Sequence, residues 1–96
     1  MIELYQAEWC PYSSRVRQRL TELGISFVAR QVPAEPADRE ELRRKTGSDE
    51  IPALIDEGEV VAGDADALIA YLERTHSERA DAEEHRRQAE LHEHAA

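Results

Sequence analysis

The sequence has 96 residues, which is enough for one small domain. Asp and Glu outnumber Lys and Arg by 21 to 12, and the resulting formal charge of -9 disfavours binding to nucleic acid or to an anionic membrane surface. No apolar run approaches the ~20 residues of a membrane span, and the first residues have no basic leader, so we expect a cytoplasmic protein without a membrane partner.

The first third of the chain predicts a strand, a helix and a second strand. Residues 2–5 alternate between apolar and polar and indicate a strand. Pro11 is suited to the first position of a helix and Gly24 to its end, which predicts a helix over residues 11–23. Residues 26–32 are rich in β-forming side chains, and a β-α-β unit of this kind predicts parallel strands.

The middle of the chain predicts a short helix followed by a hairpin. Residues 37–46 lie between Pro36 and Gly47 and indicate a mostly exposed helix. Residues 53–56 and 59–61 flank a Glu-Gly turn and indicate two antiparallel strands.

The last third predicts one more packed helix and a charged extension. Asp64 or Asp66 can cap this helix, whose apolar residues recur at helical spacing. Residues 77–96 are dense in charged residues and have little to bury, so we expect a solvated continuation of the same helix that frays toward its end.

Cys10 is the only cysteine and lies where the first strand passes into the helix that Pro11 opens. The backbone N–H groups of Tyr12 and Ser13 and the helix dipole then point toward the sulfur. Helix N-termini lower the pKa of a thiol from its usual ~8.5, and the Ser13 hydroxyl adds a possible hydrogen bond. Cys10 is therefore predicted to be a nucleophile, although a lone cysteine can also be a buried apolar residue.

Three segments together resemble the glutaredoxins. Residues 9–13, Trp-Cys-Pro-Tyr-Ser, are similar to that family's active-site motif in the monothiol form with serine in place of the second cysteine. Residues 46–52 are similar to the segment that ends in Thr-Val-Pro, and residues 62–66 to the Gly-Gly-x-Asp-Asp segment. The three segments occur in the family's order and at its separations.

This resemblance implies an α/β protein with the thioredoxin fold. The expected architecture is a four-stranded mixed sheet flanked by three helices, with a C-terminal helical extension. Residues 1–76 would form the glutaredoxin-like domain, and residues 77–96 a charged tail that is helical or frayed.

The resemblance also implies a groove that binds a thiol peptide such as glutathione. Pro52 would be a cis-proline facing the thiol, and the Ile51 backbone would pair with the cysteinyl backbone of the peptide. Gly63 belongs to the same site, and Asp64 or Asp66, with the free N–H groups of the last helix, would hold the γ-glutamyl end.

Other residues complete this implied groove. Arg43 aligns with the position that contacts the glycyl carboxylate of glutathione, a task suited to a guanidinium group, although it is equally well explained as a solvated arginine. Tyr12 would form an aromatic wall, and Trp9 an apolar contact for protein partners.

Three positions depart from the family pattern. Ala7 stands where glutaredoxins usually have a lysine that stabilises the thiolate, which predicts slower turnover. Glu50 replaces a threonine and adds negative charge to a site for an anionic tripeptide. Ala62 replaces one glycine of a pair and fits only if its φ is negative.

The resemblance implies a thiol-disulfide oxidoreductase that serves electron transport and cell redox homeostasis. Because Ser13 replaces the second cysteine, Cys10 would act alone on mixed disulfides between proteins and glutathione or another γ-glutamyl thiol. The expected partners are this small thiol and glutathionylated or disulfide-bearing proteins. We expect a monomer with no tightly bound cofactor and no metal.

Two alternatives remain open. Some monothiol members of the family carry a [2Fe–2S] cluster between two protomers, although Pro11 disfavours the loop that this needs. The Ala7 and Glu50 departures instead favour a non-catalytic domain that binds thiol peptides or protein partners. The histidines, His76, His85, His92 and His94, are expected to be solvated rather than to bind a metal.

Overall fold

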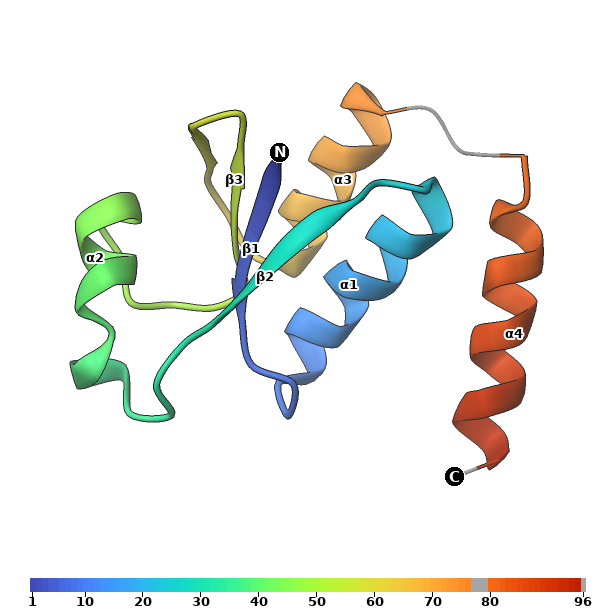
Figure 1. Ribbon diagram of the computed structural model, residues 1–96, viewed down its shortest axis with the longest axis horizontal. Helices are drawn as coiled ribbons and strands as arrows, with labels where there is room; N and C mark the ends of the chain where they lie inside the picture. Colours follow the sequence, from blue (N-terminus) through green and yellow to red (C-terminus); the bar gives the residue numbers. More distant parts are fainter. Residues whose placement is uncertain (77–79, 96) are drawn as a thin grey trace.

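The central strand of the sheet is β1 (Ile2–Gln6), which pairs with a different neighbour on each side. It runs parallel to β2 (Phe27–Gln31) and antiparallel to β3 (Ala53–Asp56). β4 (Glu59–Val61) pairs antiparallel with β3, so that the strand order is β2-β1-β3-β4. Figure 1 shows this arrangement, which confirms the predicted mixed sheet of four strands.

The computed structural model describes residues 1–76 and 80–95. None of the helices within these ranges combines the length and the apolar character that crossing a bilayer requires.

The turn between β3 and β4 has the backbone that a tight hairpin needs. Glu57 has a φ of 50° and Gly58 a φ of 84°, and two consecutive positive φ values match the twist of the flanking strands. The hairpin predicted around this Glu-Gly pair is therefore confirmed.

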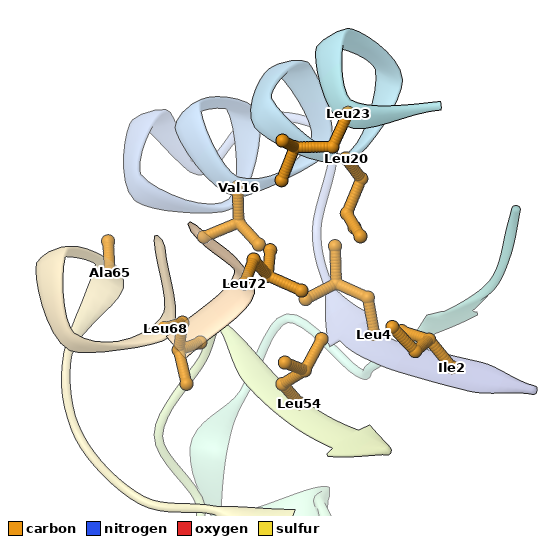
Figure 2. Packing of buried hydrophobic residues seen from close by; sticks show 9 residues of the cluster. All are labelled: Ile2, Leu4, Val16, Leu20, Leu23, Leu54, Ala65, Leu68 and Leu72. Carbon is orange, nitrogen blue, oxygen red and sulfur yellow. The ribbon is translucent and has the colours of Figure 1, made fainter. Parts of the chain in front are cut away.

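Helices cover both faces of the sheet. Neighbouring strand residues point to opposite faces, so Leu4 packs in one cluster and Tyr5 in another. The larger cluster joins the sheet to α1 (Pro11–Leu23) and α3 (Ala65–Thr75), as Figure 2 shows. The smaller cluster includes Leu42, the one buried residue of α2 (Glu40–Thr46). The predicted three flanking helices are thus present.

Local signals set both ends of α1. Pro11 occupies its first turn, and Gly24 ends it in the left-handed conformation with a φ of 75°. The helix spans the predicted residues 11–23, and its start places Cys10 at the cap position.

The helix predicted over residues 37–46 is interrupted, which corrects that expectation. The chain forms a 3₁₀ turn, η1 (Pro36–Asp38), and then α2 (Glu40–Thr46), with Arg39 between them at φ -86° and ψ 57°. Arg39 is buried, and its guanidinium donates hydrogen bonds to three backbone carbonyls, those of Pro33, Ala34 and Asp49. These contacts with the surrounding loops hold the break.

The charged tail does not continue α3, which is a second correction. α3 ends at Thr75, where His76 is extended, and a separate helix, α4 (Ala82–Ala95), lies alongside α1 (Figure 1). Ala82 is buried, and Arg86 lies 3.3 Å from the buried carboxylate of Glu22 in α1. The tail therefore packs on the domain, whereas we expected it to be solvated. Residues 77–79 and 96 of the predicted tail lie outside the described residues.

Candidate active site

Cys10 is positioned by the start of α1. It caps this helix with extended backbone, and its own N–H donates to the carbonyl of Ala7 over 3.1 Å. Its Sγ accepts a hydrogen bond from the backbone N–H of Ser13 at 3.4 Å. The side chain is 6% exposed, so the thiol lies just below the surface. The first turn of α1 thus directs backbone donors at the sulfur.

The surroundings of Cys10 favour the thiolate. Burial raises the pKa of the thiol, but the hydroxyl and N–H of Ser13, the N–H of Tyr12 and the charge of Arg17 together lower the pKa below its ordinary value. Apart from the thiol, the buried Ser13 hydroxyl has no hydrogen-bond partner in the part of the chain that the structure describes. A thiolate is the nucleophilic form of cysteine, so the site is suited to disulfide exchange.

Arg17 is a contributor that the sequence analysis did not identify. It lies seven residues after Cys10, two helical turns along α1, and the same face of a helix recurs at that spacing. Its guanidinium donates to the Gln6 side chain and lies 3.2 Å from the Glu8 carboxylate. Arg17 therefore supplies positive charge to a site that has Ala7 in place of the usual lysine. The seven-residue spacing from Cys10 is the feature of the sequence that could have predicted this role.

A groove of about 520 Å³ is lined by Trp9 and Tyr12, which lie close to Cys10 in the sequence. Its lining includes five of the predicted residues, namely Tyr12, Ile51, Pro52, Gly63 and Asp64. The Ile51–Pro52 peptide bond is cis, as the resemblance implies. Trp9 lines the groove as well, and both Trp9 and Tyr12 are largely exposed to solvent. The groove is large enough for a small-molecule ligand.

Two predicted site residues lie elsewhere. The Arg43 guanidinium donates to the carbonyls of Pro36 and Ala37, at 2.8 and 2.7 Å, and Arg43 is not among the groove-lining residues of the described chain. Asp66 pairs with Arg15 of α1 and is likewise outside the lining. Of the two candidate helix caps, the structure selects Asp64, whose Oδ1 accepts from the Ala67 N–H at 3.0 Å.

Arg39 lines the groove instead of Arg43, but its guanidinium group is hydrogen-bonded to the protein backbone. Its three hydrogen bonds, at 2.8, 2.9 and 3.1 Å, all go to backbone carbonyls. The sequence does not predict these hydrogen bonds, because the carbonyl acceptors belong to loops before and after Arg39.

The groove has an acidic lining. Asp49, Glu50 and Asp64 contribute carboxylates, and Arg39 is the only cation among its lining residues in the described chain. The Asp49 carboxylate lies 3.7 Å from the guanidinium of Arg43. The Glu50 carboxylate has no hydrogen bond or ion pair within residues 1–76 and 80–95. Negative charge therefore dominates this surface.

Gly63 allows the backbone that lines the groove to lie close to the first turn of α3. Its φ is +121°, and a Cβ at this position would lie 2.5 Å from the Cβ of Ala67. Any larger residue would both strain the backbone and push against the first turn of α3.

The histidines supply no metal site in the described chain. No group of three or more His, Cys, Asp or Glu residues is arranged to hold an ion among the residues that the structure covers. His85 of α4 lies 3.1 Å from Asp81, the residue just before that helix. The side chain of His94 lies outside the described set.

The sequence matches a known domain family over most of its length. The family is described as "Glutathione S-transferase, N-terminal domain", and the match covers residues 4–80. This range contains all of the sheet except the first two residues of β1, together with the cysteine and every residue of the groove.

A glutaredoxin and a glutaredoxin-like protein are among the similar sequences. Glutaredoxin 3 of Escherichia coli (strain K12) is 29% identical over 62 residues, which cover 65% of this chain and 75% of that protein. An uncharacterized glutaredoxin-like 8.6 kDa protein in the rubredoxin operon of Clostridium pasteurianum is 27% identical over 63 residues, covering 66% of this chain and 84% of that one.

Solved glutathione transferases share the fold. A delta-class glutathione transferase from Nilaparvata lugens superposes with a TM-score of 0.72 at 18% identity, over 85% of this chain and 38% of that chain. Rice GST1 in complex with glutathione gives a TM-score of 0.67 at 23% identity, over 76% of this chain and 32% of that one. The chain thus spans less than two fifths of either transferase, and at these identities the likeness shows the thioredoxin-like fold alone.

Proposed function

Because this chain belongs to the family of glutathione S-transferase N-terminal domains, we propose that it is a thiol-disulfide oxidoreductase in which Cys10 acts as the sole nucleophile. Its substrates would be mixed disulfides between proteins and glutathione or another γ-glutamyl thiol. The observation that carries the proposal is the Cys10 thiol itself, which accepts the Ser13 N–H at 3.4 Å and has a lowered pKa beside an open groove. The similarity to Escherichia coli glutaredoxin 3 supports the same chemistry.

The reaction proceeds in two exchanges. The Cys10 thiolate attacks the small-thiol sulfur of the mixed disulfide, a new S–S bond forms, and the electron pair of the broken bond leaves on the protein sulfur. A second small thiolate then attacks the sulfur of the small thiol bound to Cys10. This releases the Cys10 thiolate and an oxidised small-thiol disulfide, so that two electrons pass from the small thiol to the protein. Because the chain has one cysteine, no internal disulfide takes part.

The groove residues orient the small thiol in this proposal. The Ile51 backbone pairs with the cysteinyl backbone of the thiol peptide, and the Asp64 carboxylate holds its γ-glutamyl ammonium group. Both residues line the groove together with Pro52 and Gly63, which is the arrangement that this binding mode requires.

The test is glutathione-dependent reduction of a glutathionylated peptide by the purified protein. Cys10→Ser should lose the rate, whereas Ser14→Ala, on the exposed side of the same helical turn, should keep it. A rate that survives in Cys10→Ser, or the absence of any rate above background in the wild-type protein, would reject the proposal.

The same sample addresses the two alternatives. A [2Fe–2S] carrier would show visible absorption that disappears in Cys10→Ser. The acidic lining of the groove is the observation that favours a binding domain without catalysis, and such a domain would bind thiol peptides without turnover.

A further inference from the structure

The groove beside Cys10 continues into a second hollow. This hollow, of about 370 Å³, shares four lining residues with the first groove, namely Glu50, Pro52, Gly63 and Asp64. From that junction it follows the outer strand β4, where Val60 and Val61 line it. The two hollows together form a channel that extends from Trp9 and Tyr12, which lie close to Cys10 in the sequence, to the outer strand β4. We call this the extended groove.

The junction of the extended groove is negatively charged. Glu50 and Asp64 belong to both hollows, and the Glu50 carboxylate is unpaired within the described chain. Among the lining residues that the structure describes, Arg39 is the only cation in either hollow, and its guanidinium is turned toward three backbone carbonyls. Apart from Arg39, no arginine or lysine of the described chain lines the channel.

Aromatic side chains stand at the other end of the extended groove. Trp9 is 67% exposed and Tyr12 59% exposed, although both are large apolar residues. Exposed aromatic faces attract arginine and lysine side chains as well as apolar groups. The aromatic end and the acidic junction thus favour the same kind of ligand.

We propose that, beside the small thiol held at Ile51 and Asp64, the extended groove binds the other half of the mixed disulfide, the cysteine-bearing segment of a protein substrate whose flanking residues are arginine or lysine. The channel is longer than the first groove alone, which suits an extended peptide, and its charge is complementary to a basic one. Glutathione carries a net negative charge, so the Glu50 carboxylate adds nothing to its binding and is available to a basic partner. The charged lining thus selects the protein half of the mixed disulfide.

This inference rests on the proposed function for its chemistry. In the first exchange, the sulfur of the basic peptide is the leaving group that takes up the electron pair, and the bond made is between Cys10 and the small-thiol sulfur. Recognition of the peptide can nevertheless be measured without any exchange.

Trp9 makes the test direct, because it is the only tryptophan of the chain and lines the groove. Its fluorescence is titrated with two peptides without tryptophan that have an S-methylated cysteine and differ only in having arginine or glutamate on both sides of it. The S-methyl group prevents disulfide exchange. We expect the arginine peptide to bind about tenfold more tightly at low salt, and the difference to shrink as salt is added.

A matched pair of variants separates the groove from the overall charge. Glu50→Gln should lower the preference for the arginine peptide about threefold. Glu90→Gln removes the same charge from the exposed surface of α4 and should leave the preference unchanged. Equal binding of the two peptides, or an equal effect of the two variants, would overturn the inference. Failure of the proposed function would appear separately, as absent turnover in the glutathionylated-peptide assay.

Discussion

The backbone N–H of Ser13 donates to the Sγ of Cys10 across 3.4 Å, and the hydroxyl of the same serine faces the thiol. One residue thus contributes two of the interactions that lower the pKa of Cys10. A serine in place of a second cysteine removes the internal disulfide, yet it retains hydrogen-bond donors for the thiolate.

Ser13→Ala removes the hydroxyl and leaves the backbone donor in place. We expect the pKa of Cys10 to rise, because the thiolate loses one hydrogen bond. The measurement is the pH dependence of thiol alkylation. Ser14→Ala is the control, since Ser14 lies next to Ser13 but is exposed. An unchanged alkylation profile in Ser13→Ala would show that the hydroxyl does not stabilise the thiolate.

The lowered pKa of Cys10 also predicts how stability depends on pH. A thiolate that is more stable in the folded state adds to the free energy of unfolding at pH values above the unfolded pKa, ~8.5. This contribution is lost as the pH falls through the lower folded pKa. The difference in unfolding free energy between the wild-type protein and Cys10→Ser should therefore increase with pH in that window, as measured by urea denaturation. A difference that is constant with pH would contradict the lowered pKa.

The features that were predicted correctly depend on local signals. Pro11 and Gly24 determine the two ends of α1, and the Glu57-Gly58 pair determines the hairpin turn. Each works through its own backbone conformation and needs no distant partner, so the cysteine at the start of α1 could be placed from the sequence.

The features that were missed depend on contacts between distant residues. The break at Arg39 is held partly by the carbonyl of Asp49, ten residues away. The packing of α4 involves Arg86 and Glu22, which are separated by 64 residues. The sequence does not show whether a charged side chain is solvated or paired with another residue, because that depends on which residues the fold brings together.

Arg17 should be the residue that compensates for the missing lysine at Ala7. Arg17→Gln removes a positive charge that lowers the pKa of Cys10, so this pKa should rise and alkylation at neutral pH should slow. Arg87→Gln, on the exposed surface of α4, changes the net charge equally and should have no effect. Because salt screens charges, the difference in alkylation rate between Arg17→Gln and the wild-type protein should become smaller at high salt. Equal alkylation rates in both variants would exclude this role.

Arg39 is expected to support the wall of the groove rather than to bind a ligand. Arg39→Lys keeps the charge but cannot reproduce three hydrogen bonds from one planar group, so we expect a loss of about 3 kcal/mol in unfolding free energy. Arg44→Lys, on the exposed side of α2, should change stability by less than about 0.5 kcal/mol. Thermal or urea denaturation measures both. A ligand-binding role would instead leave stability intact and weaken binding alone.

Gly63 offers a way to separate backbone strain from close packing. Gly63→Ala introduces both an unfavourable φ of +121° and a Cβ that would lie 2.5 Å from the Cβ of Ala67, so we expect a loss of about 3 kcal/mol in unfolding free energy. Gly47→Ala has a φ of +79° but nothing within 4 Å of the new Cβ, and should lose only about 1 kcal/mol. Adding Ala67→Gly to Gly63→Ala removes the contact and should recover part of the loss, after allowance for the cost of Ala67→Gly alone. The unfolding free energies of the four variants are measured by urea denaturation. Equal losses in Gly63→Ala and Gly47→Ala would show that α3 shifts to accommodate the new Cβ without a loss of stability.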